Sequence, residues 1–254
     1  MLRSEINTLI EEAKSFFVEM KWLLPPFAFF KLNDWGKILT NENLHLQYKD
    51  ILDKGLGWDV TDFGSGDFYK NGLLLFTMRN GDINGVRNYA EKIMIVRENQ
   101  VTDWHYHWSK AEDIINRGGG NLIMELYNAA DEDNPEPQPS EKCDEGVFDD
   151  NKDVKVYLDG KWETVKPGGK ISLKPGESIT CPPRLYHTFY GDQGKGTVLV
   201  GEISKVNNDN IDNRFYAHLP RYTKIINDVL PQHLLCNEYN KINEIENEVT
   251  DRNG

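Results

Sequence analysis

The sequence has few cysteines, no long apolar run and no excess of positive charge. Its cysteines, Cys143, Cys181 and Cys236, lie far apart and form no CxxC pair. A disulfide framework and a thiolate zinc site are therefore excluded, and we expect three reduced, structural cysteines. The longest apolar stretches, such as 73–76, fall far short of the roughly 20 residues needed to cross a bilayer, so no membrane-spanning segment is predicted.

Positive charge is scarce relative to negative charge. The 254 residues include 29 Lys and Arg against 41 Asp and Glu, a formal net charge of −12 at pH 7. Because nucleic acids and anionic membrane surfaces are bound mainly through Lys and Arg, neither is expected as a partner. The first residues carry an early acid, Glu5, and no long apolar segment, so no signal peptide is predicted and the expected location is the cytoplasm.

What the sequence does contain is a helical start followed by many short strands. Between Ser4 and Met20, apolar residues recur every three or four positions, which predicts an amphipathic N-terminal helix. From about Gly72 onward, short runs rich in β-branched and aromatic residues alternate with turn dipeptides such as Asn80-Gly81. The predicted strands are 73–79, 89–97, 101–108, 122–127, 154–158, 161–165, 170–173, 178–181, 186–190 and 197–204.

These patterns predict a fold dominated by β-structure, a sandwich or barrel of short antiparallel strands. We expect a single domain over 1–254, with a helical or irregular extension (1–70), the barrel (71–204) and a C-terminal segment with a polar tail (205–254). A short helix is expected after Pro220. The acidic, proline-bearing stretch 128–153 is interpreted as a solvated loop.

Two histidines one residue apart mark the candidate metal site. On a strand, His105 and His107 project from the same face about 7 Å apart, as two ligands of one ion require. Glu112 stands at an even position and the two histidines at odd positions, so on a continuous strand its side chain would face the opposite way. The chain must therefore bend between His107 and Glu112 if the carboxylate is to join them. Such a bend also makes Lys110 a candidate to point into the same cavity. The alternative is that the histidine pair is only a polar surface feature.

A fourth ligand is expected from a distant strand, since a barrel brings non-neighbouring strands around one interior. Of the remaining four histidines, His187 is the best placed, within 181–191. Three neutral imidazoles and one carboxylate suit Mn²⁺, Fe²⁺, Co²⁺, Ni²⁺ or Zn²⁺. We expect one divalent ion per subunit, with Mn²⁺ as the first choice.

The spacing of these residues resembles the two signatures of the cupin superfamily. His105-x-His107, Glu112 and then Gly118 or Gly119 resemble the first signature, whereas Gly176, Pro182 and His187 resemble the second. Arg184 stands where the family has a glycine, which departs from the expected turn. The resemblance implies a jelly-roll barrel in which the three histidines and the glutamate hold a divalent metal.

Longer stretches narrow the resemblance to the D-lyxose ketol-isomerase family. They occur in family order and cover most of the chain; among them are Leu24-Pro-Pro-Phe-Ala, Leu56-Gly-Trp-Asp-Val-Thr, Tyr89-Ala-Glu-Lys-Ile-Met and Glu112-Asp-Ile-Ile-Asn-Arg-Gly-Gly-Gly-Asn-Leu. Membership implies a metal-dependent aldose–ketose isomerase that interconverts D-lyxose with D-xylulose, and usually D-mannose with D-fructose. The substrate carbonyl and its neighbouring hydroxyl would fill two open positions on the ion, and a base would carry a proton between C2 and C1.

We expect Glu202 to be that base. Alternation places Glu202 on the strand face of Val198 and Val200, where an apolar barrel interior would raise its carboxyl pKa toward neutrality. The alternative is a paired acid on the surface. Lys110 would donate a hydrogen bond or proton to the oxygen that develops charge, unless it is a solvated lysine in a turn.

Other polar residues have weaker assignments. The family resemblance alone makes Lys92 a contact to a sugar oxygen. Asp212 and Arg214 either cover the barrel mouth or, as we expect, belong to an ordinary charged loop.

The aromatic residues that alternate with the histidines, Trp104, Tyr106 and Trp108, face away from them and are expected to pack against a second sheet or a partner subunit. With the N-terminal helix, this row motivates the prediction of a homodimer. Two alternative functions remain: a non-haem iron dioxygenase on the same ligands and a non-catalytic sugar-binding sensor. The sequence leaves open whether isomerisation uses an enediol or a hydride shift.

Overall fold

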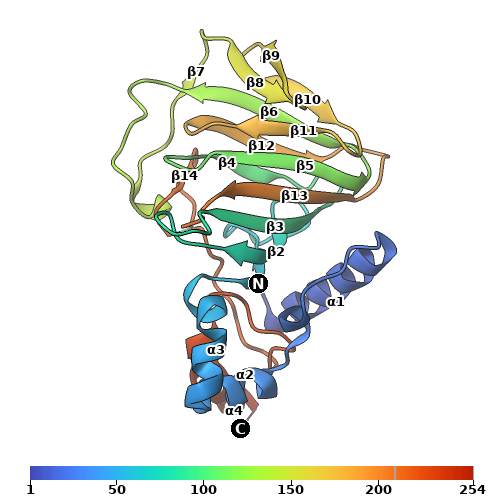
Figure 1. Cartoon of the computed structure of the whole chain (residues 1–254), viewed down its shortest axis with the longest axis vertical. Coiled ribbons are helices and arrows are strands. Elements are labelled where there is room, and N and C mark those ends of the chain that lie inside the picture. The colour runs from blue at the N-terminus through green and yellow to red at the C-terminus, as the bar shows by residue number, and fades with distance from the viewer. Residues whose placement is uncertain (209, 254) are drawn as a thin grey trace.

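Two β-sheets face each other around an apolar interior and form a jelly-roll barrel with helices at one end (Figure 1). The structure, a computed structural model, describes residues 1–208 and 210–253. The strands are β1 (Gly57–Thr61), β2 (Leu73–Asn80), β3 (Tyr89–Val96), β4 (Thr102–His107), β5 (Glu112–Gly119), β6 (Leu122–Ala129), β7 (Phe148–Asp149), β8 (Val154–Leu158), β9 (Lys161–Val165), β10 (Gly169–Leu173), β11 (Ser178–Cys181), β12 (Leu185–Gly191), β13 (Val198–Lys205) and β14 (Asn213–Phe215).

The larger sheet has the strand order β1-β2-β3-β13-β5-β11-β8-β9, and the smaller sheet has the order β10-β6-β12-β4-β14, with β7 paired to β6. Neighbouring strands in both sheets are antiparallel, as short strands joined by turns favour. The predicted β-dominated barrel is therefore confirmed.

Strands β2 and β3 of the larger sheet are apolar on both faces because each face has a partner layer. On β2, Leu73 and Leu75 point into the barrel, whereas Leu74 and Phe76 point outward into a second core. Helix α1 (Arg3–Glu19) covers that outer face and buries Ile6, Leu9, Ile10, Ala13 and Phe17, so the predicted amphipathic helix is confirmed.

The other helices gather at the end of the molecule away from the smaller sheet (Figure 1). They are α2 (Leu32–Thr40), α3 (Glu42–Asp53) and α4 (Ile242–Asn253), with 3₁₀ turns η1 (Pro26–Phe29) and η3 (Tyr239–Lys241). A further 3₁₀ turn, η2 (Ser140–Lys142), lies apart from them beside β14. The predicted short C-terminal helix is present but lies later than expected. Residues 221–238 form no helix, and α4 begins in the polar tail, because Ile245 packs against Trp35 and Tyr239.

The predicted strands all occur, with shifts of a residue or two at their ends, but β1, β5, β7 and β14 were not predicted. Two of them, β1 and β14, lie outside the predicted barrel limits of 71–204. Strand β5 ends in glycines, and its register with β13 is irregular at the same place, where the backbone needs conformations that glycine adopts. At Gly119, whose φ is +85°, an added Cβ would lie 2.2 Å from the carbonyl oxygen of Thr197.

The interpretation of 128–153 as a solvated loop is wrong in part. Asp133, Ser140 and Cys143 within it are buried, because the segment folds back onto the outside of the smaller sheet. All three cysteines are free thiols, as predicted.

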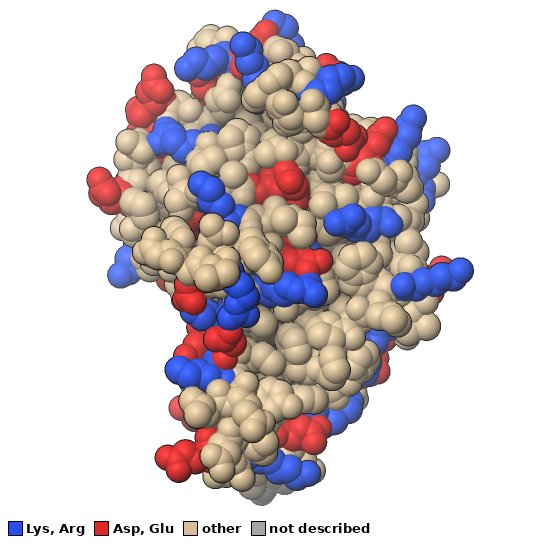
Figure 2. Space-filling model, in the orientation of Figure 1, with Lys and Arg blue, Asp and Glu red and all other residues tan. Residues whose placement is uncertain are grey.

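The visible surface has charges of both signs. On the face shown in Figure 2, acidic and basic side chains are interspersed rather than gathered by sign. Among the described residues, no helix combines the length and apolarity that a bilayer crossing requires.

Candidate metal centre and active site

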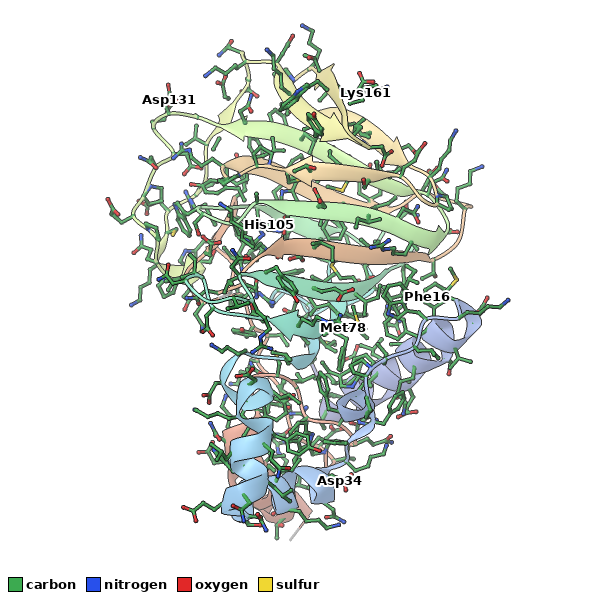
Figure 3. All side chains as sticks on the ribbon, viewed as in Figure 1. Phe16, Asp34, Met78, His105, Asp131 and Lys161 are labelled. Carbon is green, nitrogen blue, oxygen red and sulfur yellow. The ribbon has the colours of Figure 1, made fainter. Side chains whose placement is uncertain are left out.

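The four predicted metal ligands meet inside the barrel. Each of His105, His107, Glu112 and His187 offers one ligand atom, and these atoms all lie within 4.8 Å of one another. Figure 3 marks His105 within the barrel. The side chains of His107, Glu112 and His187 are at most 6% exposed. The prediction that these residues come together is therefore confirmed by their geometry.

Three strands and one bend bring the ligands together. His105 and His107 lie on the inner face of β4, and His187 on β12 is the direct cross-strand partner of His105. Glu112 begins β5, after the predicted bend in the chain at residues 108–111. The Asp212 carboxylate holds this bend: it accepts from the backbone N–H groups of Ser109 (2.9 Å) and Lys110 (3.2 Å), and from the Ser109 hydroxyl (2.9 Å).

Backbone carbonyls orient all three imidazoles. The Nδ1 atoms of His105, His187 and His107 lie 2.8, 3.0 and 3.1 Å from the carbonyl oxygens of Asp103, Leu185 and Asp212, respectively. A carbonyl oxygen can only accept, so Nδ1 carries the proton in each ring and the Nε2 lone pair is left for the site. Metal-binding histidines are commonly held in this way.

Two buried atoms at the centre of the group, Glu112 Oε1 and His187 Nε2, lie 3.0 Å apart. Within residues 1–208 and 210–253, neither atom has a hydrogen-bond partner. Buried polar atoms without partners are costly and rare, so their presence together indicates a place for a cation. Burial, with the neighbouring histidines, also lowers the pKa of His105 well below its usual range, which keeps the ring neutral and able to coordinate.

The ligand carboxylate is ionised. Burial alone would raise the pKa of Glu112, but the Lys110 ammonium 2.8 Å from Oε2 lowers it well below its usual range. A carboxylate that stays charged inside the barrel is the form that binds a divalent cation.

Beside the ligands lies a second charged group built on Glu202. Its Oε1 is 2.8 Å from Lys110 Nζ and 3.3 Å from Lys92 Nζ, and all three side chains are buried. Glu202 faces the barrel as alternation predicted, and Lys110 shares the side of Glu112. The expected rise of the Glu202 pKa is wrong: burial would raise it, but the ammonium groups of Lys110 and Lys92 lower it, so the surroundings are cationic rather than apolar.

Three of the ligands, His105, His107 and Glu112, line one cavity with Glu202, Lys110 and Lys92. Its remaining wall is largely apolar, from both sheets and from the segment before β2: Phe63, Leu73, Leu75, Met94, Ile114, Phe189 and Phe215. Sequence reasoning missed Asn207, whose Oδ1 accepts from Lys92 Nζ (3.0 Å) and Lys110 Nζ (3.4 Å). An asparagine in a polar loop carries no periodic signal, and only its contacts show this role.

Asp212 and Arg214 are not part of an ordinary charged loop. Asp212 is 8% exposed and supports His107 and the 108–111 bend, as described above. Arg214, on β14, is 2% exposed and points away from the cavity, where its Nη2 lies 2.6 Å from Asp133 Oδ1. Both residues are buried against other strands, which the local sequence does not reveal, and this burial explains why the expectation of an ordinary charged loop was wrong.

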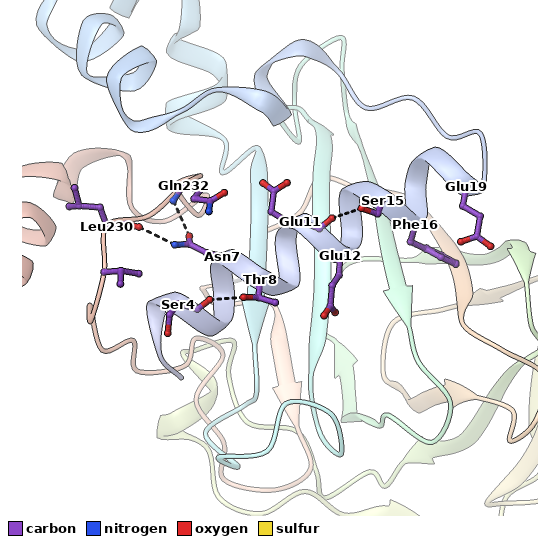
Figure 4. Close-up of a pocket in the computed structure, with 11 residues that line it drawn as sticks. Ser4, Asn7, Thr8, Glu11, Glu12, Ser15, Phe16, Glu19, Leu230 and Gln232 are labelled. Atoms are coloured by element: carbon purple, nitrogen blue, oxygen red, sulfur yellow. Dashed lines mark hydrogen bonds between the residues drawn. The ribbon is translucent and has the colours of Figure 1, made fainter.

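A wider hollow on the surface lies away from this cavity, along the exposed face of α1 (Figure 4). It is lined mainly by hydroxyl and carboxylate side chains of α1, with residues 229, 230 and 232 opposite. No histidine lines it among the described residues, and we assign it no part in the chemistry.

Comparison with known sequences identifies the family. The sequence pattern of D-lyxose isomerase matches residues 1–239. The chain belongs to the D-lyxose isomerase family. It is similar to the D-lyxose/D-mannose isomerases of Serratia proteamaculans and Escherichia coli O157:H7, each 45% identical over 242 residues, which cover 94% of this chain and 98% of each relative. Membership of this isomerase family makes the chain an aldose–ketose isomerase.

Solved structures confirm the barrel type. The L-ribose isomerase of Cellulomonas parahominis bound to L-ribose has a TM-score of 0.53 at 14% identity, covering 89% of this chain and 98% of that protein. The L-ribose isomerase of Acinetobacter sp. DL28 in complex with L-ribose has a TM-score of 0.50 at 13% identity, covering 88% and 98%. At such identities the likeness shows the fold alone, and that fold is the predicted cupin jelly roll.

Proposed function

We propose that this isomerase interconverts D-lyxose with D-xylulose, and also D-mannose with D-fructose, with the help of one divalent metal ion per subunit. The observation that carries the proposal is that the four ligand atoms lie within 4.8 Å of one another and that three of the ligands, His105, His107 and Glu112, line one cavity with the Glu202–Lys110 pair. The substrates are supported by the relatives named D-lyxose/D-mannose isomerase.

The residues fit a metal such as Mn²⁺, our first choice, or Zn²⁺, Co²⁺, Fe²⁺ or Ni²⁺. His105, His107, Glu112 and His187 would hold it through three Nε2 lone pairs and a carboxylate, and the unpartnered Glu112 Oε1 and His187 Nε2 support this assignment. When bound, the ion would polarise the sugar carbonyl and stabilise the negative charge that develops on its oxygen.

Glu202 is the proposed base. Its lowered pKa makes it a carboxylate at neutral pH, able to accept the proton from C2 of the aldose and return it to C1. Lys110 holds the Glu202 carboxylate through its 2.8 Å contact and would donate a hydrogen bond to the substrate oxygen as its charge grows. Lys92 lies beside Glu202 and is the proposed contact to another sugar oxygen.

The apolar wall has a role in this reaction as well. Aromatic and aliphatic side chains from both sheets enclose the charged groups and keep water from them. In such surroundings the charged contacts of Lys110 and Glu202 are stronger than in water, and a proton held on Glu202 exchanges less readily with solvent.

Neither alternative function is favoured by an observation on this site. A dioxygenase could use the same ligands, but it would stop when oxygen is removed, whereas the isomerase would continue. A sugar sensor would keep its ligand affinity in Glu202→Gln and would have no turnover to lose.

The test is a panel of aldopentoses and aldohexoses incubated with the apoprotein and each divalent ion in turn, with ketose formation as the readout. We expect ketose from D-lyxose and D-mannose only when an ion is added. Absence of ketose with every ion would refute the proposal. The same assay with a C2-deuterated sugar distinguishes the proton route, which loses label to water, from a hydride shift, which retains it.

Three further predictions remain: a single domain over residues 1–254, a cytoplasmic location and a homodimer. The aromatic argument for the dimer is weaker than the sequence suggested. Trp104, Tyr106 and Trp108 contact aromatic rings or the insertion of their own chain, with Trp108 Nε1 donating to the Pro135 carbonyl at 3.0 Å. Sedimentation of the purified protein at micromolar concentration would test the homodimer.

A further inference from the structure

The acidic insertion, defined here as residues 130–147, takes no part in the proposed reaction, yet it is tied firmly to the barrel. It leaves the end of β6, descends to the side of β14 and returns to β7 (Figure 1). At its start Asp131 and Glu132 are exposed, and Figure 3 shows Asp131 on the outside of the molecule. The next acid, Asp133, is only 3% exposed.

Asp133 binds side chains from three neighbouring strands of the smaller sheet. Its Oδ1 accepts from Nη2 (2.6 Å) and Nε (3.2 Å) of Arg214 on β14, and its Oδ2 accepts from the Tyr186 hydroxyl on β12 at 2.5 Å. Its backbone carbonyl accepts from the Tyr106 hydroxyl on β4 at 3.2 Å. These strands are adjacent in the sheet, in the order β12-β4-β14.

Two of these strands, β4 and β12, carry ligands of the candidate metal centre on their other face, and β14 contributes to the lining of the cavity. Tyr106 lies between His105 and His107 in the sequence, and Tyr186 precedes His187, so each tyrosine points away from the barrel where its neighbouring histidines point inward. Arg214 is the cross-strand partner of Tyr106 and lies two residues after Asp212, which supports His107. Asp133 therefore joins the outer sides of β4 and β12, which carry three of the ligands, and of β14, which follows the supporting residue Asp212.

Arg184 strengthens this attachment. It stands where the cupin signature has glycine and adopts the left-handed backbone conformation that glycine favours, with a φ of +63°. Its Nη2 donates to the carbonyl oxygens of Ala130 (3.0 Å) and Asp133 (3.1 Å). The departure from the family pattern thus supplies a side chain that holds the insertion at Asp133.

We propose that Asp133 is a positioning residue, which fixes the spacing of β12, β4 and β14 from the outside and so sets the metal affinity of the centre on their inner face. This inference rests on the proposed metal-dependent function. Removing the Asp133 charge would leave the buried Arg214 guanidinium without its carboxylate and free the strands to shift. Groups that orient metal ligands change metal affinity by about 10-fold to 100-fold when they are lost.

The test compares Asp133→Asn with Asp131→Asn, the same substitution two residues away on an exposed side chain. Each apoprotein is titrated with Mn²⁺ by calorimetry well below its melting temperature, and kcat, KM and the melting temperature are measured alongside. We expect Asp133→Asn to weaken Mn²⁺ binding about 10-fold and to raise the Mn²⁺ concentration needed for half-maximal kcat by the same factor, with little change in sugar KM. Asp131→Asn should match the native protein.

The outcomes separate this inference from the proposed function. If the native apoprotein binds no divalent ion, the proposed function fails. If the native protein binds Mn²⁺ and Asp133→Asn binds it equally well while melting at a lower temperature, Asp133 is only a stabilising residue and the inference is overturned. Should Asp133→Asn fail to fold, Tyr186→Phe removes one hydrogen bond to Asp133; weaker Mn²⁺ binding supports the inference, and unchanged binding overturns it.

Discussion

The two faces of β4 differ in how their polar groups are satisfied. On the outer face, the hydroxyl groups of Tyr106 and its neighbour Tyr186 and the Trp108 Nε1 all donate to the chain's own insertion. On the inner face, His107 and its neighbours meet at a point where Glu112 Oε1 and His187 Nε2 have no hydrogen-bond partner in the described part of the chain.

The contrast indicates that the outer face of β4 has a structural role and that its inner face belongs to the reactive site. A polar group buried without a partner costs about 1–3 kcal/mol, and a fold keeps such groups together only where a ligand can satisfy them. On the outer face, the hydroxyl groups and a guanidinium are hydrogen-bonded to the insertion. This face can therefore fix the positions of the strands, but its polar groups are not available to coordinate a metal. The following experiments test whether the two faces have these separate roles, and the one with the largest expected effect comes first.

Glu112→Gln should have the largest effect, because it removes the one charged ligand while keeping the shape of the side chain. We expect Mn²⁺ affinity to fall ~100-fold or more and ketose formation to fall about 10³-fold, measured by calorimetry and by sugar assay. Asp113→Asn is the matched control, since Asp113 lies next along β5 and bonds Thr180. Equal losses of Mn²⁺ affinity and of ketose formation in the two variants would contradict the assignment of Glu112 as a metal ligand.

Glu202→Gln should affect turnover but not metal binding. The variant keeps the size of the side chain and loses the base, so kcat should fall about 10³-fold while the Mn²⁺ affinity of the apoprotein changes little. Glu91→Gln is the control, because Glu91 precedes Lys92 on β3 and its carboxylate pairs with Arg79 outside the cavity. A Glu202→Gln enzyme with native kcat would remove Glu202 from the reaction.

Asp212→Ala should have an intermediate effect. The substitution leaves three donors in the 108–111 bend without their acceptor, so Lys110 and Glu112 lose precise placement. We expect about a 10-fold loss in Mn²⁺ affinity and a smaller loss in Asp212→Asn, which keeps one acceptor oxygen. Native affinity in both variants would show that the bend holds its shape without Asp212; Asn210→Ala, at an exposed site in the same loop, controls for nonspecific change.

The last prediction concerns the pH dependence of stability rather than the chemistry. Burial lowers the pKa values of His105 and His233 below the unfolded value of about 6.5, so the unfolded chain binds more protons than the folded one as the pH falls below that value. The free energy of unfolding of the apoprotein should therefore decrease from pH 6.5 to pH 5, by up to about 1.4 kcal/mol per pH unit for each histidine. Denaturant titrations across this range check it, and a flat profile contradicts it.

The ligand set could be predicted because its signal is local. Side-chain parity on a strand places His105 and His107 on one face, and the same parity requires the bend that brings in Glu112. The strand β5 itself was missed, since its charged residues and run of glycines do not look like a strand; pairing with β13 and β11 supplies its hydrogen bonds. Helices α2 and α3 were missed for a related reason, because their apolar residues pack mainly on each other and on the C-terminal segment.

Short-range periodicity alone gave the apolar faces of the strands, the side chains that could ligate a metal and the amphipathic character of the N-terminal helix. Only the tertiary structure decided the charge state of Glu202 and the hydrogen-bond partners of His107 and Asp133. Those properties depend on Lys110, Asp212 and Arg214, which lie some 80 to 105 positions away in the sequence from the groups they contact. Electrostatic fields and hydrogen bonds act through space, so they exist only once the chain has folded.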